Sequence, residues 1–452
     1  MMKFPKAGVK TGVVFFPAFD WAISANHPER EERLLYTRDQ IFEEGLFDVE
    51  GITEYPPSLA TVEDVERVHL CLPSPEKVVT SSHYISAGGA IAVGEAVMKG
   101  EVERGFALVR PPGHHATRVV RGLRGFCVIN IEAVMLEHLR KQYGPLRVAI
   151  IDTDCHHGDG TQEVYWNDPN TLFISLHQDG RTLYPGTGFP SEFGGPGGYG
   201  ATLNIPMPPG TGDKGYLYVI DNFVLPVLED FKPDLIINSA GQDNHFSDPL
   251  TNMSLTAKGY AELTRRLSPH LAVLEGGYSV QSALPYVNTG ILLALAGLDT
   301  SNVIEPLYSP EVSVQSKKTD EFLKELCDMM LYRYESRKNL FEESFGDKEY
   351  HETTKNLFHD EAGISEHQRE KTRICRDCPG VTLLATSAPG YSEDYLITLP
   401  LGGCPKCREV AEEAFQKAST DEFDTILFQD RPNDVTLKKG GPKPTQTRSR
   451  WL

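Results

Sequence analysis

Acidic residues and histidines crowd one short stretch of the sequence, DTDCHHGDG at positions 152–160. Asp152, Asp154 and His156 are spaced two residues apart, and side chains at that spacing point the same way in an extended segment. Carboxylate oxygens and imidazole nitrogens are both ligands that Zn²⁺ accepts. We therefore expect these side chains to form part of a metal site. The alternative, a polar loop that only caps a strand, fits so dense a cluster poorly.

Further reactive side chains follow other apolar stretches. His114 and His115 lie in RPPGHHA, where two prolines and a glycine predict a rigid loop. Adjacent histidines on a loop usually have no role beyond forming part of the polar surface. Because this pair follows a predicted strand, as the acidic cluster does, we favour a catalytic role for it. Asp243, in GQDNHFSD, and Tyr278, in EGGY, also follow apolar runs. Sites in open α/β sheets lie beyond the carboxyl ends of the strands, so we expect these residues to share an edge with Asp154.

The elements that must position these side chains follow from the hydrophobic pattern. Short β-branched runs alternate with stretches of helical periodicity, which predicts an α/β fold with an open, mostly parallel sheet flanked by helices. The run before Asp152 is short and wholly apolar, as in a buried parallel strand. Strands are expected at 9–16, 106–110, 146–151, 171–177, 201–206, 233–240 and 271–274, and helices at 27–44, 87–98, 131–141, 161–166, 215–231 and 317–345.

Composition narrows the class of protein. The 452 residues, 40% of them hydrophobic, suffice for one large domain and a smaller one. The net charge of −19 argues against a protein that coats nucleic acid and mainly favours solubility. No run of ~18–20 apolar residues is present, so no membrane span is expected. Eight cysteines without an export signal predict a reducing, cytoplasmic location, where paired cysteines more often bind metal than form disulfides.

Six motifs occur in a recognisable order: RPPGHHA, GFCVIN, DTDCHHGDGT, SLHQDGRTLYPGTG, SAGQDNHFSD and LEGGY. In residues 9–297, about two thirds of the chain, the sequence resembles the histone deacetylase superfamily, within the arginase/deacetylase fold. The forms RPPGHHA and LEGGY are closer to class II and bacterial members than to class I. Members are Zn²⁺-dependent amidohydrolases that remove acetyl groups from amines, above all from lysine side chains.

The resemblance implies a role for each reactive residue. Asp154, His156 and Asp243 match the zinc ligands, and three protein ligands leave a position for water and the substrate carbonyl. His115 matches the general base that takes the proton of this water and later protonates the leaving amine. His114 matches its electrostatic partner.

Supporting residues are implied as well. Asp152 would orient His114, and Asp159 would orient His115, which allows the two imidazoles different charge states. Tyr278 matches the tyrosine that donates a hydrogen bond to the developing oxyanion. The family also holds a K⁺ next to the zinc, which implies a site formed by Asp152, Asp154, His156, Ser175 and Leu176.

The resemblance also implies a substrate pocket. Phe126 and Tyr184 match two aromatic residues that sandwich the acyl-lysine stem, and Arg33 matches an arginine at the base of an acetate-release cavity. From the residues alone, Arg33 could equally be a solvated helix charge and Tyr184 a cover for the core. The predicted pocket also includes Gly125, Leu250 and Gly276.

One position bears on substrate choice. In polyamine-selective relatives an acidic residue follows the DP after the third zinc ligand, whereas Leu250 follows Asp248-Pro249 here. A leucine cannot pair with a distal ammonium, so we predict a preference for acyl-lysine in proteins or peptides over acetylpolyamines. A deacetylase of small acylated amines is the first alternative. A non-catalytic acyl-lysine-binding scaffold is the second, and a homo-oligomer is compatible with either.

The C-terminal third carries two CxxC pairs separated by 25 residues. Strands are expected between the pairs, at 381–387 and 395–399, and a helix near 408. This spacing predicts a zinc-ribbon or treble-clef-like module with a closed, structural Cys₄ site, and redox or unpaired thiols are the alternative. The sequence leaves open whether the module docks a partner, forms a dimer contact or covers the catalytic mouth. The four ligands are Cys375, Cys378, Cys404 and Cys407.

The chain thus divides into a deacetylase-like catalytic domain (1–312), a helical linker (313–372), the cysteine module (373–430) and a basic flexible tail (431–452). Within the linker, residues 347–371 are charged and weakly patterned, which favours a linker or exposed helix. The tail has six basic residues and one acid and is expected to be disordered. A weak contact with nucleic acid or an acidic partner is the alternative for the tail.

Overall fold

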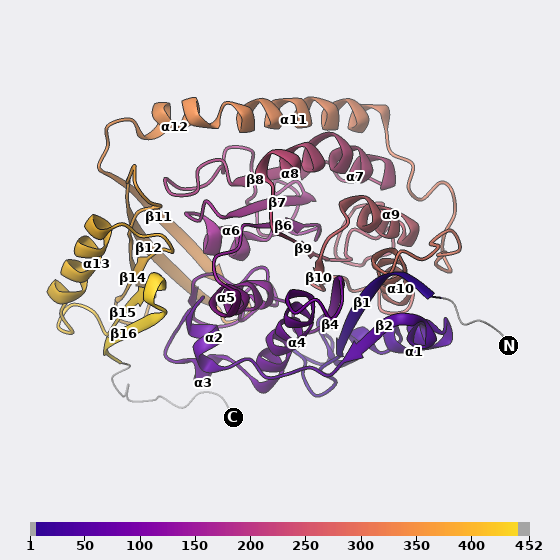
Figure 1. The fold of residues 1–452 in the computed structure, drawn as a ribbon, viewed down its shortest axis with the longest axis horizontal. Coiled ribbons are helices and arrows are strands. Elements are labelled where there is room, and N and C mark those ends of the chain that lie inside the picture. Colours follow the sequence, from indigo (N-terminus) through magenta and orange to yellow (C-terminus); the bar gives the residue numbers. More distant parts are fainter. Residues whose placement is uncertain (1–5, 442–452) are drawn as a thin grey trace.

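The computed structural model describes residues 6–441, and a parallel sheet forms the centre of its larger part (Figure 1). The eight strands lie in the order β2-β1-β4-β10-β9-β6-β7-β8, and all pairings between them are parallel. The predicted α/β fold is confirmed. The strands are β1 (Lys6–Phe16), β2 (Glu50–Tyr55), β4 (Arg104–Val109), β6 (Val148–Asp152), β7 (Thr171–Gln178), β8 (Thr202–Met207), β9 (Leu235–Ser239) and β10 (Leu271–Val273).

Alternate residues of the strands enter two hydrophobic cores, one on each face of the sheet. In β6, Ala149 and Ile151 belong to one core and Val148 and Ile150 to the other, which explains why this strand is apolar throughout. Helices α2 (Val62–Glu66), α4 (Ser81–Met98) and α5 (Ile131–Tyr143) cover one face. The other is covered by α1 (Thr37–Glu43), α7 (Asp213–Val219), α8 (Leu225–Phe231), α9 (Ala257–Leu267), α10 (Leu284–Leu295) and α11 (Lys317–Glu335).

Three predicted helices are divided in the structure. Residues 27–44 form the short 3₁₀ helix η1 (Glu31–Leu34) and α1, and a π-helical turn, η3 (Ile220–Val224), separates α7 from α8. The segment 317–345 forms α11 and α12 (Arg337–Phe345). The remaining short elements of the larger part are η2 (Leu46–Asp48), β3 (Leu70–Cys71), α3 (Pro75–Val78), β5 (Val119–Val120) and α6 (Asp159–Tyr165).

The C-terminal part is a six-stranded sheet with one long helix, α13 (Pro405–Lys417). The predicted linker or exposed helix at 347–371 is wrong, because this segment forms most of a β-hairpin. In strand β12 buried and exposed positions alternate, but the buried ones include the polar residues Glu366, Gln368 and Glu370. Apolar and polar residues therefore do not alternate along the strand, and its sequence does not show the usual β pattern. The strands are β11 (Tyr350–His359), β12 (Ile364–Arg373), β13 (Thr382–Ser387), β14 (Asp394–Leu399), β15 (Thr425–Asp430) and β16 (Val435–Gly440), paired in this order.

The predicted disordered tail is also wrong in its first ten residues. Residues 431–433 form a 3₁₀ turn, η4 (Arg431–Asn433), and β16 pairs antiparallel with β15. Since β16 is almost wholly exposed, backbone pairing rather than apolar burial orders it, and the hydrophobic pattern gives no sign of that. The rest of the predicted tail, 442–452, lies outside the described residues.

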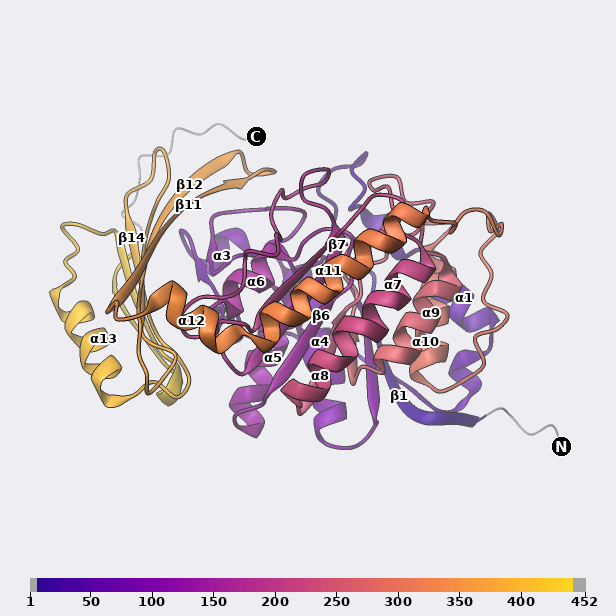
Figure 2. The ribbon, with the colours of Figure 1, turned by 90° about the horizontal axis from the view of Figure 1, so that it is seen from above.

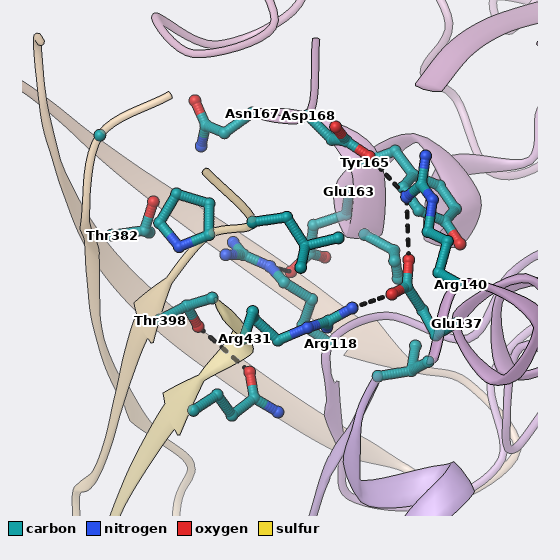
Figure 3. A pocket seen from close by; sticks show the side chains of 16 residues that line it. Arg118, Glu137, Arg140, Glu163, Tyr165, Asn167, Asp168, Thr382, Thr398 and Arg431 are labelled. Carbon is teal, nitrogen blue, oxygen red and sulfur yellow. Dashed lines mark hydrogen bonds and ion pairs between the residues drawn. The ribbon is translucent and has the colours of Figure 1, made fainter. Parts of the chain in front are cut away.

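The C-terminal sheet packs directly on the larger part (Figure 2). Arg121 Nη2 lies 3.0 Å from Asp394 Oδ2, and Arg118 forms an ion pair with Glu370. Arg431 pairs with Glu137 at the edge of a cavity of about 90 Å³ between the two parts (Figure 3). The apolar centre of the contact consists of Leu70, Leu72 and Val119 from the larger part and Leu384, Leu396 and Leu427 from the sheet.

No helix within residues 6–441 is both long and apolar enough to span a bilayer.

Candidate active site

Loops after β6 and β9 bring together Asp154, His156 and Asp243. One ligand atom from each residue lies within 4.8 Å of those of the other two. His156 Nδ1 lies 2.8 Å from Asp243 Oδ2 and 3.2 Å from Asp154 Oδ1. Because β6 and β9 are adjacent and parallel, their carboxyl ends lie side by side, which accounts for the convergence.

The surroundings of these three side chains fit a bound cation. Both carboxylates are fully buried, and their negative charges outweigh burial and raise the pKa of His156 to about 10. The cluster therefore favours a positive charge, which a Zn²⁺ bound to neutral His156 would supply. Gly276 leaves room for it, because a Cβ there would lie 2.5 Å from Asp243 Oδ2 and 2.6 Å from Asp154 Oδ2.

His114 and His115 lie next to this cluster, on the loop after β4. Their ring centroids are 4.1 Å apart, and that of His115 is 6.0 Å from that of His156. Each ring has its own carboxylate: His114 Nδ1 lies 3.1 Å from Asp152 Oδ2, and His115 Nδ1 lies 2.8 Å from Asp159 Oδ1. The structure thus contains both histidine–aspartate pairs expected from the sequence.

The two imidazoles differ in their preferred charge. Burial lowers the pKa of His115 to about 3, and the positive charge of His114 acts in the same direction. Burial opposes ionisation of His114 as well, but Asp154 and Asp152 outweigh it and raise the pKa of His114 well above its ordinary value. At neutral pH this arrangement gives one charged and one neutral imidazole, and the neutral one can accept a proton.

Arg124 is a residue that the sequence reasoning missed. Its guanidinium donates to both carboxylate oxygens of Asp159, with Nη1 2.9 Å from Oδ1, and Nη1 also lies 3.0 Å from the His115 carbonyl oxygen. Although Asp159 is buried, Arg124 lowers the pKa of this carboxyl group. A signal existed, since Arg124 immediately precedes the GFCVIN motif, but nothing in the sequence links it to Asp159.

Glu275 was missed in the same way. Its Oε2 accepts hydrogen bonds from the backbone nitrogens of Gly113, at 2.7 Å, and His114, at 3.0 Å. This carboxyl group, from the segment after β10, therefore holds the loop that carries both histidines. Its place in LEGGY, three residues before Tyr278, was the available signal.

Tyr278 lies above a buried arginine. The backbone nitrogen of Tyr278 donates to Asp248 Oδ2 at 2.7 Å, and the Arg33 guanidinium is 5.0 Å from the Tyr278 ring centroid. Arg33 is fully buried and paired with Glu29, so it is not a solvated helix charge. Burial raises the pKa of Tyr278 well above its ordinary value, which keeps its phenol protonated as a hydrogen-bond donor.

Residues 72–294 match the histone deacetylase domain. A protein of Archaeoglobus fulgidus described as a probable deacetylase is 48% identical over 331 residues, which cover 67% of this chain and 91% of that protein. The chain belongs to the histone deacetylase family. This confirms the family inferred from the six motifs.

This histone deacetylase family member is also similar to a bacterial relative and to a solved structure. A histone deacetylase-like amidohydrolase of Pseudomonas aeruginosa is 38% identical over 232 residues, covering 49% of this chain and 60% of that protein. The crystal structure of the HDA15 HD domain is similar with a TM-score of 0.62 and 29% identity, covering 75% of this chain and 99% of that one.

The predicted substrate pocket of this deacetylase-family chain lies beside the histidines. The Phe126 ring centroid is 5.5 Å from that of Tyr278, and the Tyr184 ring centroid is 5.2 Å from that of His115. Gly125 is against His115, since a Cβ there would lie 2.5 Å from His115 Cδ2. The structure thus places the two aromatic rings around the candidate base and oxyanion donor.

The remaining predicted residues also lie near this edge. Leu250 is half-buried, and its backbone nitrogen donates to Asp248 Oδ1 at 2.9 Å, which links it to the residue that holds Tyr278. Asp152 and Ser175 are register partners on β6 and β7, so the predicted K⁺ residues lie on adjacent strand ends. The next residue of β7 is the buried Leu176.

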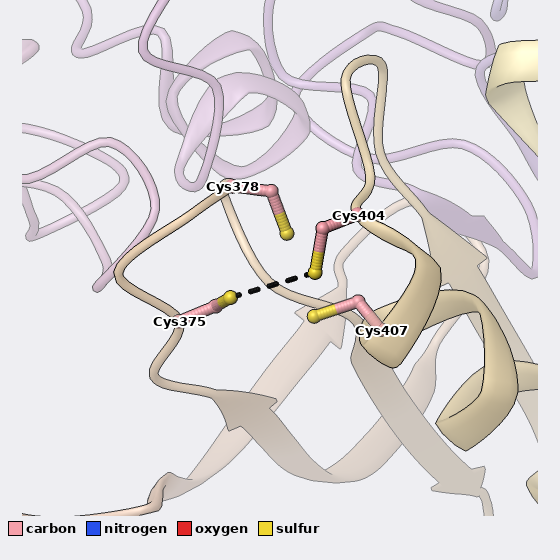
Figure 4. Close-up of side chains that lie close together, drawn as sticks. All are labelled: Cys375, Cys378, Cys404 and Cys407. Atoms are coloured by element: carbon pink, nitrogen blue, oxygen red, sulfur yellow. Dashed lines mark hydrogen bonds between the residues drawn. The ribbon is translucent and has the colours of Figure 1, made fainter.

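The four cysteines of the C-terminal part converge on one point (Figure 4). Their sulfur atoms all lie within 4.8 Å of one another, and Cys375 Sγ is 3.7 Å from Cys404 Sγ. Four thiolates at ~2.3 Å around a tetrahedral Zn²⁺ would be about 3.8 Å apart, so the cluster fits this ion. As predicted, the pairs flank the hairpin β13–β14, and the second pair lies at the start of α13.

Proposed function

We propose that this chain is a zinc-dependent deacylase that hydrolyses acyl-lysine amides in proteins or peptides. The observation that carries the proposal is the convergence of Asp154, His156 and Asp243 beside two histidines of opposite charge preference. Family membership and relatives described as deacetylases support amide hydrolysis.

Asp154, His156 and Asp243 would hold the catalytic Zn²⁺. When bound, this ion would polarise the amide carbonyl and lower the pKa of a water molecule towards ~7. Three protein ligands leave the open position that this chemistry requires.

His115 is the proposed general base and, later, the general acid. Asp159 engages its Nδ1, which leaves Nε2 to accept the water proton and return it to the leaving amine. A neutral ring is required for the first step, and the low pKa of His115 supplies it. His114, kept charged beside Asp152, would stabilise negative charge that develops on the substrate.

Tyr278 would donate its phenolic proton in a hydrogen bond to the oxyanion. Phe126 and Tyr184 would enclose the lysine stem and exclude water, and Gly276 would keep space beside the metal. Arg33, buried behind Tyr278, would attract the acetate product after cleavage.

Two further ions belong to the proposal. A K⁺ would bind near Asp152 and Ser175 and fix the carboxyl ends of β6 and β7, and a second Zn²⁺ in the Cys₄ cluster would be structural, since four thiolates leave no open position. The cytoplasmic location expected from the cysteines stays a prediction.

Turnover of matched substrates by the purified chain tests the function. We expect hydrolysis of an acetyl-lysine peptide that stops on removal of zinc by a chelator and returns when Zn²⁺ is added. A clearly slower rate on N-acetylputrescine is expected, because Leu250 offers no charge for a distal ammonium. A faster rate on the polyamine would favour the small-amine alternative, and peptide binding without turnover would favour the scaffold.

A further inference from the structure

The hairpin β11–β12 extends from the C-terminal sheet towards the larger part of the chain (Figures 1 and 2). Its two ten-residue strands pair antiparallel without a break from Tyr350 and Arg373 at the base to His359 and Ile364 at the tip. Asp360 and Glu361, in the turn that joins the two strands, both contact residues of the larger part. The tip therefore belongs to the surroundings of the active site as well as to the C-terminal sheet.

Asp360, at the tip, contacts the loop that carries Phe126. Its Oδ1 accepts a hydrogen bond from the backbone nitrogen of Gly125 at 2.9 Å. Gly125 and Phe126 both have positive φ, of 54° and 71°, and a bulky residue such as Phe126 adopts this conformation only where its surroundings enforce it. The hydrogen bond that Gly125 donates to Asp360 is one such contact, and it lies directly beside His115.

The neighbouring residue, Glu361, contacts His27, whose ring packs against that of Phe126. Glu361 Oε1 lies 3.6 Å from His27 Nε2, and the His27 ring centroid is 4.3 Å from that of Phe126. The tip thus contacts the wall of the substrate pocket through the backbone of Gly125 and through the ring of His27. Both contacts are absent from the catalytic domain taken alone.

The second carboxylate oxygen of Asp360 is available to a substrate. Within residues 6–441, the side chain of Asp360 forms no ion pair, and the single hydrogen bond that it accepts comes from the backbone nitrogen of Gly125. The side chain is half-buried, and its charge reinforces the effect of burial in raising the pKa of Tyr184. The Arg124 guanidinium, 5.9 Å from the Tyr184 ring centroid, already donates to both carboxylate oxygens of Asp159.

We propose that Asp360 is a positioning and specificity-determining residue of the deacylation site, with one oxygen holding the Gly125–Phe126 turn and the other attracting a positive charge next to the acyl-lysine. The preferred substrates are then acylated peptides with a basic residue beside the acyl-lysine. This inference rests on the proposed function. It also answers what the C-terminal part contributes to the reaction, since its hairpin tip completes the rim of the pocket.

The full-length chain is tested on two acetyl-lysine peptides that differ only in Arg or Gln next to the acetyl-lysine. D360N keeps an oxygen that can accept from Gly125 but removes the charge, whereas D360A removes both. D434N is the matched control, because Asp434 also joins the C-terminal part to the larger one, through Arg67 and Lys141, at a position away from the pocket.

For the wild type we expect a higher kcat/KM on the Arg peptide. In D360N the ratio between the two peptides is expected to fall about fivefold, the size of a good exposed ion pair. D360A is expected to raise KM on both peptides above the values of D360N, and D434N to behave like the wild type. Equal ratios in the wild type and D360N would overturn the charge role, and equal KM values in D360N and D360A would overturn the positioning role. A wild type inactive on both peptides would overturn the proposed function itself.

Discussion

The Arg124 guanidinium donates to both carboxylate oxygens of Asp159, and Asp159 Oδ1 also lies 2.8 Å from His115 Nδ1. The ion pair thus holds the Asp159 carboxylate in place, and this carboxylate in turn orients the ring of His115, the candidate base. It also neutralises a charge that would otherwise favour protonation of His115, so it controls both the orientation and the charge of the imidazole.

Replacing Arg124 is therefore expected to impair catalysis without contact with the substrate. R124Q should lower kcat about 10–100-fold, as loss of a partner behind a ligand or base typically does. The acid limb of the pH–rate profile should also move to higher pH, because Asp159 would then favour protonated His115. Steady-state rates from about pH 3 to 9 test this, because that range includes the low pKa of His115. R124K keeps the charge and should show the smaller pH shift, and an unchanged profile in R124Q would contradict the role.

Tyr278 should act in the transition state rather than in binding. Y278F is expected to lower kcat by ~10²–10³ with little change in KM, since one oxyanion donor is lost. The control is Y165F, which makes the same substitution in a buried tyrosine whose hydroxyl has no hydrogen-bond partner among the described residues. Similar losses in both variants would indicate a packing effect, and full activity in Y278F would remove the tyrosine from the mechanism.

Metal content should separate the two clusters. The wild type is expected to contain two zinc ions per chain, and elemental analysis should find one in D243A and one in C404A. D243A should lose turnover, whereas C404A should mainly destabilise the C-terminal part, whose core includes Cys407. C327A, in a buried cysteine of α11, should keep both ions. One zinc in the wild type would contradict the Cys₄ assignment or the catalytic one, and the variants would identify which.

The contact between the two parts should depend on pH. Despite burial, the Arg118 guanidinium lowers the pKa of Glu370 to about 2, whereas an unfolded glutamate has a pKa of ~4.3. A depressed folded pKa stabilises the native state above ~4.3, and this stability is lost as the pH falls towards 2. E370Q should therefore cost about 2–3 kcal/mol at pH 7 and about half of that at pH 3.

Denaturant unfolding at both pH values measures this difference. E352Q is the control on the same hairpin, since Glu352 pairs with Lys371 at the surface and should contribute less than ~1 kcal/mol. Equal destabilisation by E370Q at pH 7 and pH 3 would show that the Arg118 pair does not carry the effect.

The strands before Asp152 and Asp243 could be predicted because both are short apolar runs between polar segments. In a parallel sheet the ends of such strands meet at one edge, so the pattern predicted that Asp154, His156 and Asp243 lie at the same edge, and the family resemblance then assigned these three as the ligand set. The motifs then identified the family, since each combines reactive residues with the glycines and prolines of its loop.

The hairpin β11–β12 could not be predicted in this way. The buried face of β12 carries Glu366, Gln368 and Glu370, whose partners include Arg118 and Thr386 from distant parts of the chain. A polar residue is buried at low cost only when such partners are present, and hydrophobic periodicity contains no information about them. The sequence therefore predicted a charged linker.

The sequence by itself determined the sheet, the candidate metal ligands at its edge and the family, because apolar periodicity and short motifs are local properties. Only the tertiary structure decided that Arg124 holds Asp159, that Glu275 holds the histidine loop and that Asp360 reaches Gly125. These contacts join residues 35, 161 and 235 positions apart, for Arg124–Asp159, His114–Glu275 and Gly125–Asp360 respectively. The physical reason is that a hydrogen bond or ion pair depends on distance in space, which the folded chain sets and its local pattern does not.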